Sequence, residues 1–300
     1  MKKVATRYQI KKIVTAFGLL FLIFGIYGWL VEPNTLKVKY VQIHDEALHD
    51  SWGDLRIVHV SDLHLAGWSK KVARLAQRIN RLNPDIICVT GDLGQWNTEA
   101  TEVIEFFEKL ESRYGTYAVL GDSDTSSGLT RCFYCHESGN IHRLRKEPVI
   151  LRDACKSVKL SGKSLTVCGI SSQTGEIPQE VLSLWRNKVR KTYPPDLPIL
   201  VLSHFSSAWA ELPPRERVLW LSGNTHGGQI WTPGWLRPLI FRGKDYAHLK
   251  GLFRKGEHCW LYVNAGIGTT RCFPLRIGVP PEITVIEIKG GSKQKTGPHV

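Results

Sequence analysis

Hydrophobic and polar residues recur with two different periods along the first part of this 300-residue chain. Residues 36–43 alternate apolar and polar side chains, which is typical of a half-buried strand, and residues 55–60 form a second strand. Apolar residues then recur at helical spacing, at Val72, Leu75, Ile79 and Leu82. Asn83-Pro84 ends this predicted helix before a strand at 85–89.

The pattern predicts sheets and helices as far as residue 288. A second helix begins at Asn97 or Thr98 and reaches Leu110, and a strand follows at 116–120. The second half is richer in strands and contains one helix near 178–189. Its predicted strands are 149–151, 165–170, 199–202, 218–221, 260–263 and 283–288. We therefore predict an α/β (α+β sandwich) fold, with two packed mixed β-sheets flanked by helices in one domain.

The segment 13–31 departs from this globular pattern because its nineteen residues carry no charge. As a helix it would reach roughly 28 Å, about the thickness of the hydrocarbon core of a bilayer. A cleaved signal peptide is the alternative, but the apolar run is long for one and no small-x-small cleavage site follows it. Basic residues are more frequent before the segment than behind it. We predict a single-pass anchor in the cell membrane, with the N-terminus in the cytoplasm and the main domain on the outer side.

Five regions follow from this division of the chain. They are a basic cytoplasmic N-terminus (1–12), the transmembrane anchor (13–31), a linker with the first strand (32–54), the main domain (55–289) and a disordered Gly, Lys and Ser-rich tail (290–300). The formal net charge of +13 fits a partner that carries phosphates or an anionic lipid bilayer. No basic helix or zinc-finger pattern indicates a nucleic-acid partner.

Seven cysteines are too few and too unevenly spaced for a disulfide scaffold. Cys88, Cys168 and Cys259 lie inside apolar runs. A small buried thiol is the default state of such a cysteine, so we predict that all three are free and buried.

Five of the predicted strands end in short polar stretches. These are Ser61-Asp62-Leu63-His64, Thr90-Gly91-Asp92, Gly121-Asp122-Ser123-Asp124, Ser203-His204 and Gly223-Asn224-Thr225-His226. A strand that ends in Asp-x-His presents a carboxylate and an imidazole to one spot, which suits a divalent transition metal. We expect these loops to gather along one rim of the sheets and to form a metal site there.

The ordered set of polar stretches resembles the calcineurin-like metallophosphoesterases. Residues 224–229, 263–269 and 276–283 add a similarity to a membrane-anchored bacterial branch that includes UDP-diacylglucosamine hydrolases and phosphodiesterases. The resemblance implies two divalent metal ions (Mn, Fe, Zn or Mg) that activate water for attack on phosphorus. It also implies a ligand set: Asp62, His64 and His226 for the first metal, Asp92 as the bridge, and His204 for the second metal.

Three positions depart from the family pattern, all in one half of the site. Asp122 stands where the family has an Asn ligand of the second metal, Ser123 where it has a His general acid, and Asn224 where it has the first His of Gly-His-x-His. We expect Asp122 to be a sixth metal ligand and Asn224 to be a weak ligand or a phosphate contact. With His204 as its one imidazole, the second site should favour a harder ion such as Mn²⁺ or Mg²⁺.

Ser123 leaves the site without a strong general acid, a group that is typically worth about 10²–10⁴-fold in rate. The loss matters least when the leaving group is already a weak base. We therefore predict a phosphoesterase or phosphodiesterase that cleaves a phosphoester or diphosphate with a good leaving group, on a membrane-associated or lipid-linked substrate. A UDP-linked lipid is one candidate, although such lipids are made in the cytoplasm and the charge bias places this domain outside.

Cys132-Phe133-Tyr134-Cys135-His136 matches the attachment pattern of covalent c-type haem. A local Cys132–Cys135 disulfide and packed free thiols are the alternatives. The motif supports a second hypothesis from a different class, a non-hydrolytic metal- or haem-binding membrane protein on the same fold. The carboxylate of Asp122 favours the hydrolase, because a decaying metal site would not be expected to gain a ligand.

Residues 230–242 combine Trp231, Trp235 and Phe241 with two arginines and several Pro and Gly residues. This composition indicates a loop rather than a part of the core. Beside a membrane anchor, such a loop could enter the lipid interface, where Trp and Arg are favoured, or it could pack as a lid over the metal site. The sequence leaves both interpretations open.

Overall fold

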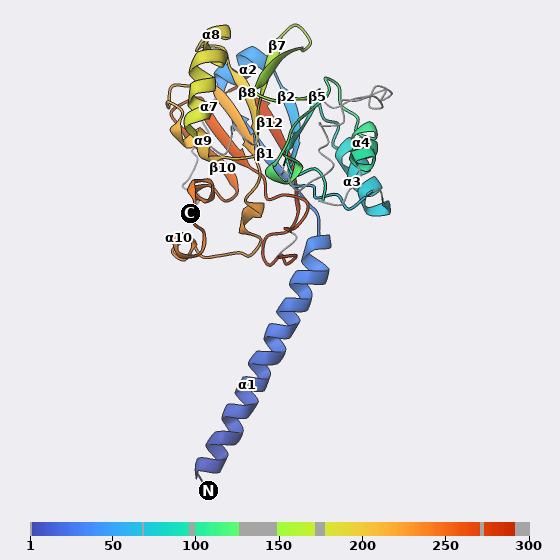
Figure 1. Ribbon diagram of the computed structural model, residues 1–300, viewed down its shortest axis with the longest axis vertical. Helices are drawn as coiled ribbons and strands as arrows, with labels where there is room; N and C mark the ends of the chain where they lie inside the picture. Colours follow the sequence, from blue (N-terminus) through green and yellow to red (C-terminus); the bar gives the residue numbers. More distant parts are fainter. Residues whose placement is uncertain are drawn as a thin grey trace.

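The computed structural model describes residues 2–67, 69–95, 100–125, 149–171, 178–270 and 273–291. Figure 1 shows one long helix, α1 (Lys2–Ile26), projecting from a layered domain. The helix continues into a π-helical turn, η1 (Tyr27–Val31), and a short 3₁₀ turn, η2 (Glu32–Asn34). Residues 11–34 contain an apolar stretch long enough to cross a membrane, with a mean hydropathy of 2.2 over an 18-residue window.

The first sheet has six strands in the order β1-β12-β2-β3-β4-β5. Their bounds are β1 (Lys37–His44), β12 (Glu282–Lys289), β2 (Leu55–Val60), β3 (Ile86–Thr90), β4 (Thr116–Val119) and β5 (Val149–Ile150). β12 runs antiparallel to β2, and every other pair in this sheet is parallel. The carboxyl ends of β2, β3 and β4 therefore meet at one edge of the sheet.

The second sheet also has six strands, in the order β10-β11-β9-β8-β7-β6. Their bounds are β6 (Ala154–Lys159), β7 (Ser164–Ile170), β8 (Ile199–Ser203), β9 (Val218–Ser222), β10 (Gly251–Lys255) and β11 (Cys259–Val263). The four inner strands are parallel, and the edge strands β6 and β10 are antiparallel to their neighbours. Both sheets are thus mixed.

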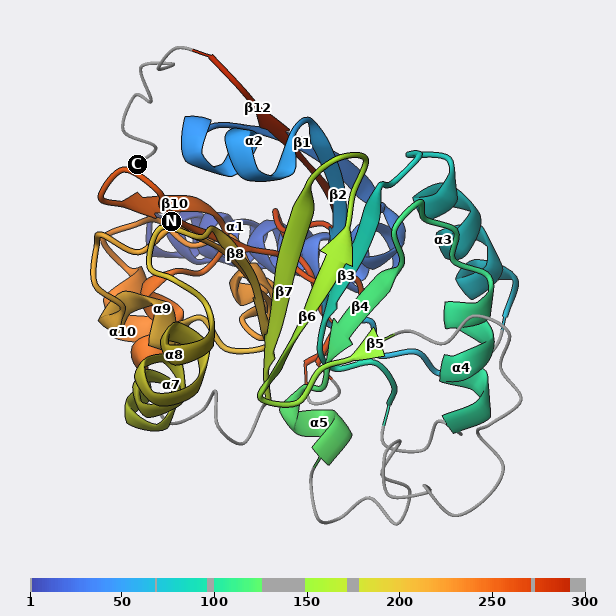
Figure 2. The same ribbon diagram turned by 90° about the horizontal axis from the view of Figure 1, so that it is seen from above.

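Helices cover the two outer faces of the sheet pair, as Figure 2 shows from above. One face carries α3 (Lys70–Asn80) and α4 (Ala100–Glu108). The other carries α7 (Pro178–Leu184), η4 (Trp185–Val189), α8 (Arg190–Thr192) and α9 (Ser207–Glu211). The remaining short helices are α2 (Glu46–Trp52), α5 (Asp122–Thr125), η5 (His226–Gly228), α10 (Arg237–Ile240) and η6 (Lys244–Ala247).

The alternation of side chains along each strand builds three hydrophobic layers. In β2, Ile57 points between the sheets, whereas Val58 and Val60 pack under α3 and α4. In β8, Leu200 lies in the layer between the sheets and Val201 in the layer under α7. Parallel strands that are covered on both faces consist of continuous apolar residues, which explains why these strands could be recognised in the sequence.

The structure confirms the predicted fold class of two mixed sheets flanked by helices. It adds α2 and the edge strands β6 and β10, which the apolar pattern did not indicate. β6 contains Lys156 and Lys159, and β10 contains Arg254 and Lys255. Charged residues are common on edge strands, where they discourage pairing with other chains, and they obscure the apolar pattern. Asn97 and Thr98, the expected start of α4, lie outside the described residues.

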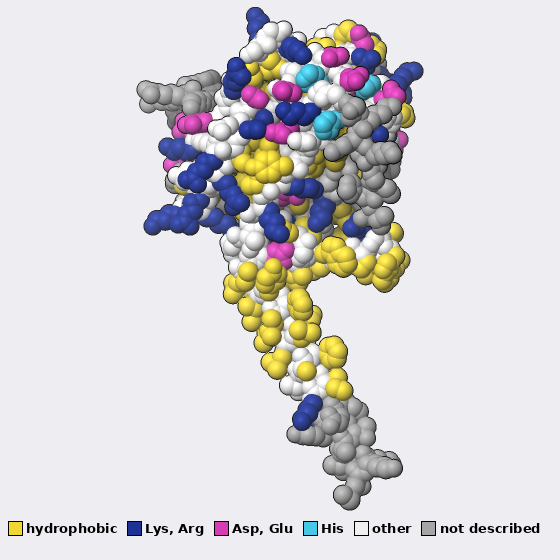
Figure 3. Space-filling model, turned by 180° about the vertical axis from the view of Figure 1, so that it is seen from behind, with side chains coloured by type: hydrophobic (Ala, Val, Ile, Leu, Met, Phe, Trp, Pro, Cys, Tyr) yellow, Lys and Arg dark blue, Asp and Glu magenta, His cyan; other side chains and the backbone are white. Residues whose placement is uncertain are grey.

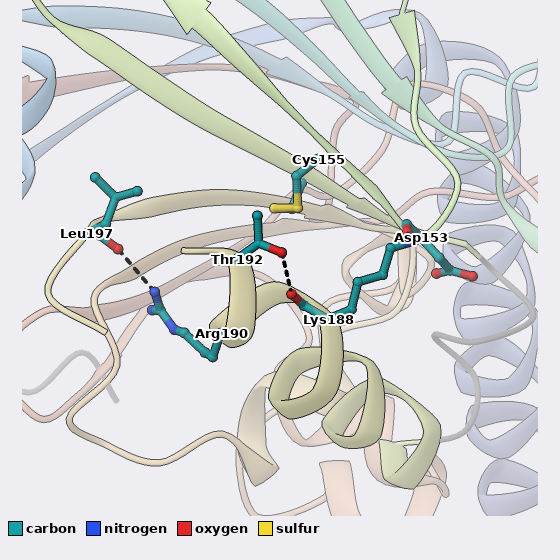
Figure 4. Close-up of a disulfide and its surroundings, with 7 residues drawn as sticks. Asp153, Cys155, Lys188, Arg190, Thr192 and Leu197 are labelled. Atoms are coloured by element: carbon teal, nitrogen blue, oxygen red, sulfur yellow. Dashed lines mark hydrogen bonds between the residues drawn. A yellow bond between two sulfur atoms is a disulfide. The ribbon is translucent and has the colours of Figure 1, made fainter. Parts of the chain in front are cut away.

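A disulfide joins Cys155 of β6 to Cys168 of β7 (Figure 4). The two residues are direct partners in the antiparallel register, with their Cα atoms 4.0 Å apart. The prediction that Cys168 is a free thiol was wrong, because the apolar run around it says nothing about the residue opposite. Cys88 and Cys259 are free and buried, as predicted.

Candidate metal centre

The polar stretches that follow the strands come together on one rim that both sheets share. The first sheet contributes Asp62 and His64 after β2, Asp92 after β3 and Asp122 after β4. The second sheet contributes His204 after β8, and Asn224 and His226 after β9. β2, β3 and β4 are parallel to one another, and so are β8 and β9, so the carboxyl ends of each set open on one side of their sheet. The rim therefore combines carboxylates mainly from one sheet with imidazoles mainly from the other.

Asp62, His64, Asp92 and His226 form the first donor group. One ligand atom from each lies within 4.8 Å of all the others. The Nε2 atoms of His64 and His226 are 3.3 Å apart, and Nε2 of His226 lies 3.5 Å from Asp62 Oδ1. The two rings are stacked with their centroids 5.1 Å apart, so the two Nε2 atoms lie side by side. Two carboxylates and two imidazoles are a common donor set for a transition-metal ion.

Asp92, Asp122 and His204 form the second donor group, which shares Asp92 with the first. His204 Nδ1 donates to the carbonyl of Thr90 at 2.8 Å. Because a carbonyl can only accept, Nδ1 carries a proton, and in the neutral ring Nε2 is then the nitrogen with a lone pair for a ligand. Nε2 lies 3.1 Å from Asp122 Oδ1 and 3.6 Å from Asp92 Oδ1.

The charges around the rim suit cations. Burial alone lowers the pKa of His204, but the nearby carboxylates of Asp92 and Asp122 outweigh burial and raise this pKa well above its ordinary value. Burial, followed by the charges of His64 and Arg276, lowers the pKa of His226 to about 3 and keeps this imidazole neutral. Several carboxylates in a buried site need positive charge beside them. The donor set therefore fits two divalent metal ions that share Asp92.

The backbone at the rim is held in an unusual conformation. Asp62 (φ 49°), His64 (φ 42°), Asp92 (φ 52°), Asn224 (φ 67°) and His226 (φ 48°) all have left-handed backbone angles. Asp, Asn and His tolerate this region better than other non-glycine residues, yet it still costs of order 1 kcal/mol or more for each residue. Such strain persists where the surrounding structure imposes it, and it clusters at functional sites.

Two glycines leave room for the carboxylates of the rim. A Cβ atom at Gly121 would collide with the carboxylate of Asp92, and one at Gly223 would collide with Ser61 and with the carboxylate of Asp62. Close approach of backbone to a side chain is a position that only glycine fills. The glycines before Asp122 and Asn224 are therefore part of the site.

The residues that depart from the family pattern contact the donor groups. Ser123 donates its hydroxyl to Asp92 Oδ2 at 3.0 Å and its backbone N–H to Oδ1 at 3.1 Å. The backbone N–H of Asn224 donates to Asp62 Oδ1 at 3.1 Å. Asp124 accepts hydrogen bonds from the N–H groups of Leu93 and Gly121 and ties these loops together. Burial, and then the charge of Asp92, raise the pKa of Asp124 to about 7.

Arg276 belongs to the site, and sequence reasoning gave it no role. Its side chain is fully buried, donates to the carbonyls of Gly268 and Val279, and has Nη2 3.4 Å from His226 Nδ1. Gly268 in turn donates its N–H to the carbonyl of Asp62. Arg276 thus holds the loop behind the first donor group. The signal in the sequence was an arginine inside the apolar, Gly and Pro-rich block 276–283.

Two other sequence predictions concern the Cys-x-x-Cys-His motif and the aromatic segment. Cys132, Cys135 and His136 lie outside the described residues. The aromatic segment does not pack as a closed lid, since Trp231 is 60% and Trp235 is 76% exposed.

Residues 55–246 match the family described as Calcineurin-like phosphoesterase. The chain belongs to this family. The resemblance drawn from the sequence is therefore confirmed. This family is a class of phosphoester hydrolases that depend on two metal ions. The rim supplies candidate ligands for both ions.

Three relatives show what kinds of protein the chain is similar to. An uncharacterised metallophosphoesterase of Bacillus subtilis, YkuE, is 26% identical over 301 residues, which cover 96% of this chain and 99% of the relative. A transmembrane protein with metallophosphoesterase domain from Danio rerio is 28% identical over 279 residues. The match covers 89% of this chain and 60% of the relative, so this chain spans less than two thirds of that protein. The UDP-2,3-diacylglucosamine pyrophosphatase LpxG of Chlamydia trachomatis is 26% identical over 306 residues, which cover 85% of this chain and 90% of the relative. The N-terminal apolar helix and the transmembrane relatives are consistent with a single-pass membrane protein.

Proposed function

We propose that this protein is a membrane-anchored hydrolase that uses two divalent metal ions to cleave a phosphodiester or diphosphate with a good leaving group. The observation that carries this proposal is the pair of donor groups that share Asp92 on one rim. Asp62, His64, Asp92 and His226 would hold one ion, and Asp92, Asp122 and His204 the other. When bound, two such ions polarise the phosphoryl oxygens and activate a water molecule.

The surroundings of Asp92 argue for a leaving group that needs no proton. The Ser123 hydroxyl already donates to the Asp92 carboxylate, so its proton is used to orient the bridging ligand. A serine hydroxyl is also too weak an acid to protonate a departing oxygen near neutral pH. A nucleoside monophosphate or a phenolate leaves without such help, whereas a simple alkoxide does not.

The second donor group favours a hard metal ion. Asp122 adds a carboxylate oxygen close to His204 Nε2, and the group has one imidazole among its described members. Oxygen-rich sites suit Mn²⁺ and Mg²⁺ better than Zn²⁺. We assign the Asn224 side chain to a weak ligand or a phosphate contact beside this ion.

The main domain belongs on the outer side of the membrane in this proposal. Basic residues are concentrated before the apolar helix, which favours a cytoplasmic N-terminus. The Cys155–Cys168 disulfide agrees with this orientation, because disulfides persist in oxidising compartments and are rare in the cytoplasm. A lipid-linked diphosphate on that side would suit a membrane-anchored enzyme. Cleavage of a diphosphate is also the reaction that the name of LpxG, a pyrophosphatase, gives for that relative. UDP-linked lipids are less suited to this orientation, because they are made in the cytoplasm.

The non-hydrolytic alternative gains no support from the described residues. Its haem motif, Cys132 to His136, lies outside them. Asp122 Oδ1 lies 3.1 Å from His204 Nε2, close enough for both atoms to bind one metal ion. The described geometry thus favours the hydrolase.

Substrate preference tests the proposal. The purified full chain with Mn²⁺ should hydrolyse bis(p-nitrophenyl) phosphate and a nucleoside diphosphate sugar much faster than glycerol 3-phosphate, an alkyl monoester. Asp92→Asn should abolish these rates, and Asp54→Asn, at an exposed carboxylate far from the rim, should not change them. Equal or faster hydrolysis of the alkyl monoester would refute the leaving-group argument. Activity that survives in Asp92→Asn would refute the metal assignment.

A further inference from the structure

The segment 230–241 exposes several large apolar side chains although its backbone is well held. Trp231, Trp235, Leu239 and Ile240, here called the docking surface, are 60%, 76%, 69% and 54% exposed. Trp231 N–H donates to the carbonyl of Ile277 at 2.7 Å, and Arg237 Nε donates to the carbonyl of Thr232 at 3.1 Å. An ordered segment that exposes four large apolar side chains is typical of a surface that binds an apolar partner.

The opposite side of the same segment is packed against the domain. The ring of Phe241 stacks on Tyr246 with centroids 5.5 Å apart, and it approaches Gly228 so closely that a Cβ there would be 2.7 Å from the ring. The inward Phe241 and the outward Leu239 and Ile240 show that the segment has a fixed inner and outer face.

The docking surface lies beside the point where the apolar helix leaves the domain. The carbonyl of Gly28 in η1 accepts the N–H of Arg276 at 2.9 Å, and Ile277 pairs with Ile230 in an isolated bridge. Glu32, which is buried, accepts the N–H of Gly278 at 2.8 Å. One short strip, 276–278, therefore joins the end of the helix to the start of the docking surface. Figure 3 shows hydrophobic side chains gathered at the base of the domain, next to the apolar helix.

We propose that the docking surface inserts into the headgroup region of the leaflet from which the apolar helix emerges, as a second membrane contact. Tryptophans with leucine and isoleucine are the side chains that interfacial segments use. The segment also carries Arg237, and Arg242 follows it directly; both suit lipid phosphates. The bilayer, rather than another protein, is the occupant because the helix that crosses it is tied to the same strip of chain.

This contact would place the metal centre at the membrane. Figure 1 shows α2 at the end of the domain far from α1, and β2 begins just after α2. β2 therefore runs toward the membrane side and delivers Asp62 and His64 there. His226 and Trp231 are joined by η5 and a short turn. If the proposed function holds, the substrate is a phosphate carried by a lipid of that leaflet, with its phosphorus near headgroup level.

Photocrosslinking of the full chain tests the membrane contact without relying on activity. A benzophenone amino acid in place of Trp235, in cell membranes or phosphatidylcholine and phosphatidylglycerol vesicles, should give lipid adducts. The same group in place of Glu257, which is 84% exposed in the turn at the far end of β10 and β11, should give none. Protein adducts at 235, or equal lipid labelling at both positions, would overturn the proposal.

A paired variant makes the test specific to the docking surface. With the probe at 231, Leu239→Glu combined with Ile240→Glu should lower the lipid adduct at least about tenfold, because each large apolar side chain removed from lipid is worth roughly a factor of ten. Leu239→Ile combined with Ile240→Leu keeps the surface apolar and should leave the yield unchanged. An unchanged yield in the Glu pair would overturn the proposal.

Hydrolysis of bis(p-nitrophenyl) phosphate in detergent reports on the metal centre alone and separates the two proposals. The Glu pair should retain this activity. Lipid adducts in a protein that hydrolyses no phosphodiester would support docking and contradict the proposed function. Hydrolysis without lipid adducts would do the reverse.

Discussion

The two donor groups of the rim share Asp92 but differ in how the protein holds them. In the first, the side chains of Asp62 and His226 are 0% and 4% exposed, and the backbone of Asn224 and the buried Arg276 support them. The second ends on Asp122, whose side chain is 61% exposed. The same rim therefore contains a half that is buried inside the protein and a half that opens to solvent at Asp122.

This difference explains two of the three departures from the family pattern, those at Asp122 and Ser123. Replacing a buried ligand such as Asp62 would leave its partners unsatisfied inside the protein, which costs several kcal/mol. Asp122 and Ser123 lie at the open half, on the short helix α5, where a change of side chain disturbs less packing. Substitutions in the open half can therefore change the metal preference and the preferred leaving group, while the residues of the buried half maintain the structure of the site.

The largest effect is expected at the residue that joins the halves. Asp92→Asn removes a carboxylate charge from both donor groups at once. Hydrogen-bond partners of metal ligands are worth about 10–100-fold in affinity or activity, so a shared ligand should be worth more than about 100-fold in kcat/KM. Phosphodiester assays with excess Mn²⁺ measure this loss. A loss below tenfold would mean that Asp92 does not connect two metals.

A gain is expected from restoring a proton donor in the open half. Ser123→His should raise the rate on glycerol 3-phosphate by roughly tenfold or more and change the rate on aryl diesters little, since a general acid contributes about 10²–10⁴-fold where the leaving group needs it. Ser123→Gln, which adds bulk without an acid, is the matched control. An equal gain on both substrates, or the same gain with Gln, would contradict the leaving-group argument.

A smaller effect, on the pH dependence of stability, is expected at His59, which contacts Thr90 at the end of β3. His59 is fully buried, its Nε2 is 2.8 Å from Thr90 Oγ1, and burial lowers its pKa to about 3. In the unfolded chain this imidazole takes a proton near pH 6.5, whereas in the folded chain it does not. As the pH falls from 6.5 toward 3, the unfolded state therefore binds one more proton than the folded state, and stability decreases by about 1.4 kcal/mol per pH unit from this residue.

Denaturant unfolding of the full chain in detergent between pH 6.5 and 4.5 measures this slope. His59→Gln should have a shallower dependence on pH than the native chain, by about one proton. Other titrating groups are common to both proteins, so the difference isolates His59. Parallel slopes would show that His59 is charged in the folded protein.

The sequence was sufficient for the parts of the molecule that depend on local pattern. Apolar runs located β2, β3, β8 and β9, and the polar residues at their ends are those that the structure brings together. Arg276 was missed because its role depends on its contact with His226, which lies fifty residues away in the sequence. The pairing of Cys155 with Cys168 was missed because it depends on strand register, which composition does not encode. The docking surface was left undecided because exposure is a tertiary property.

The central claim is that the buried and open halves each hold a metal ion. Elemental analysis by mass spectrometry on the full chain, loaded with Mn²⁺ and freed of excess metal, tests it most directly. The proposed centre should retain about two equivalents in the native chain and about one in Asp122→Ala, whose buried half is unchanged. One equivalent or less in the native chain, or no difference between the two proteins, would contradict the assignment of a second metal to Asp122 and His204.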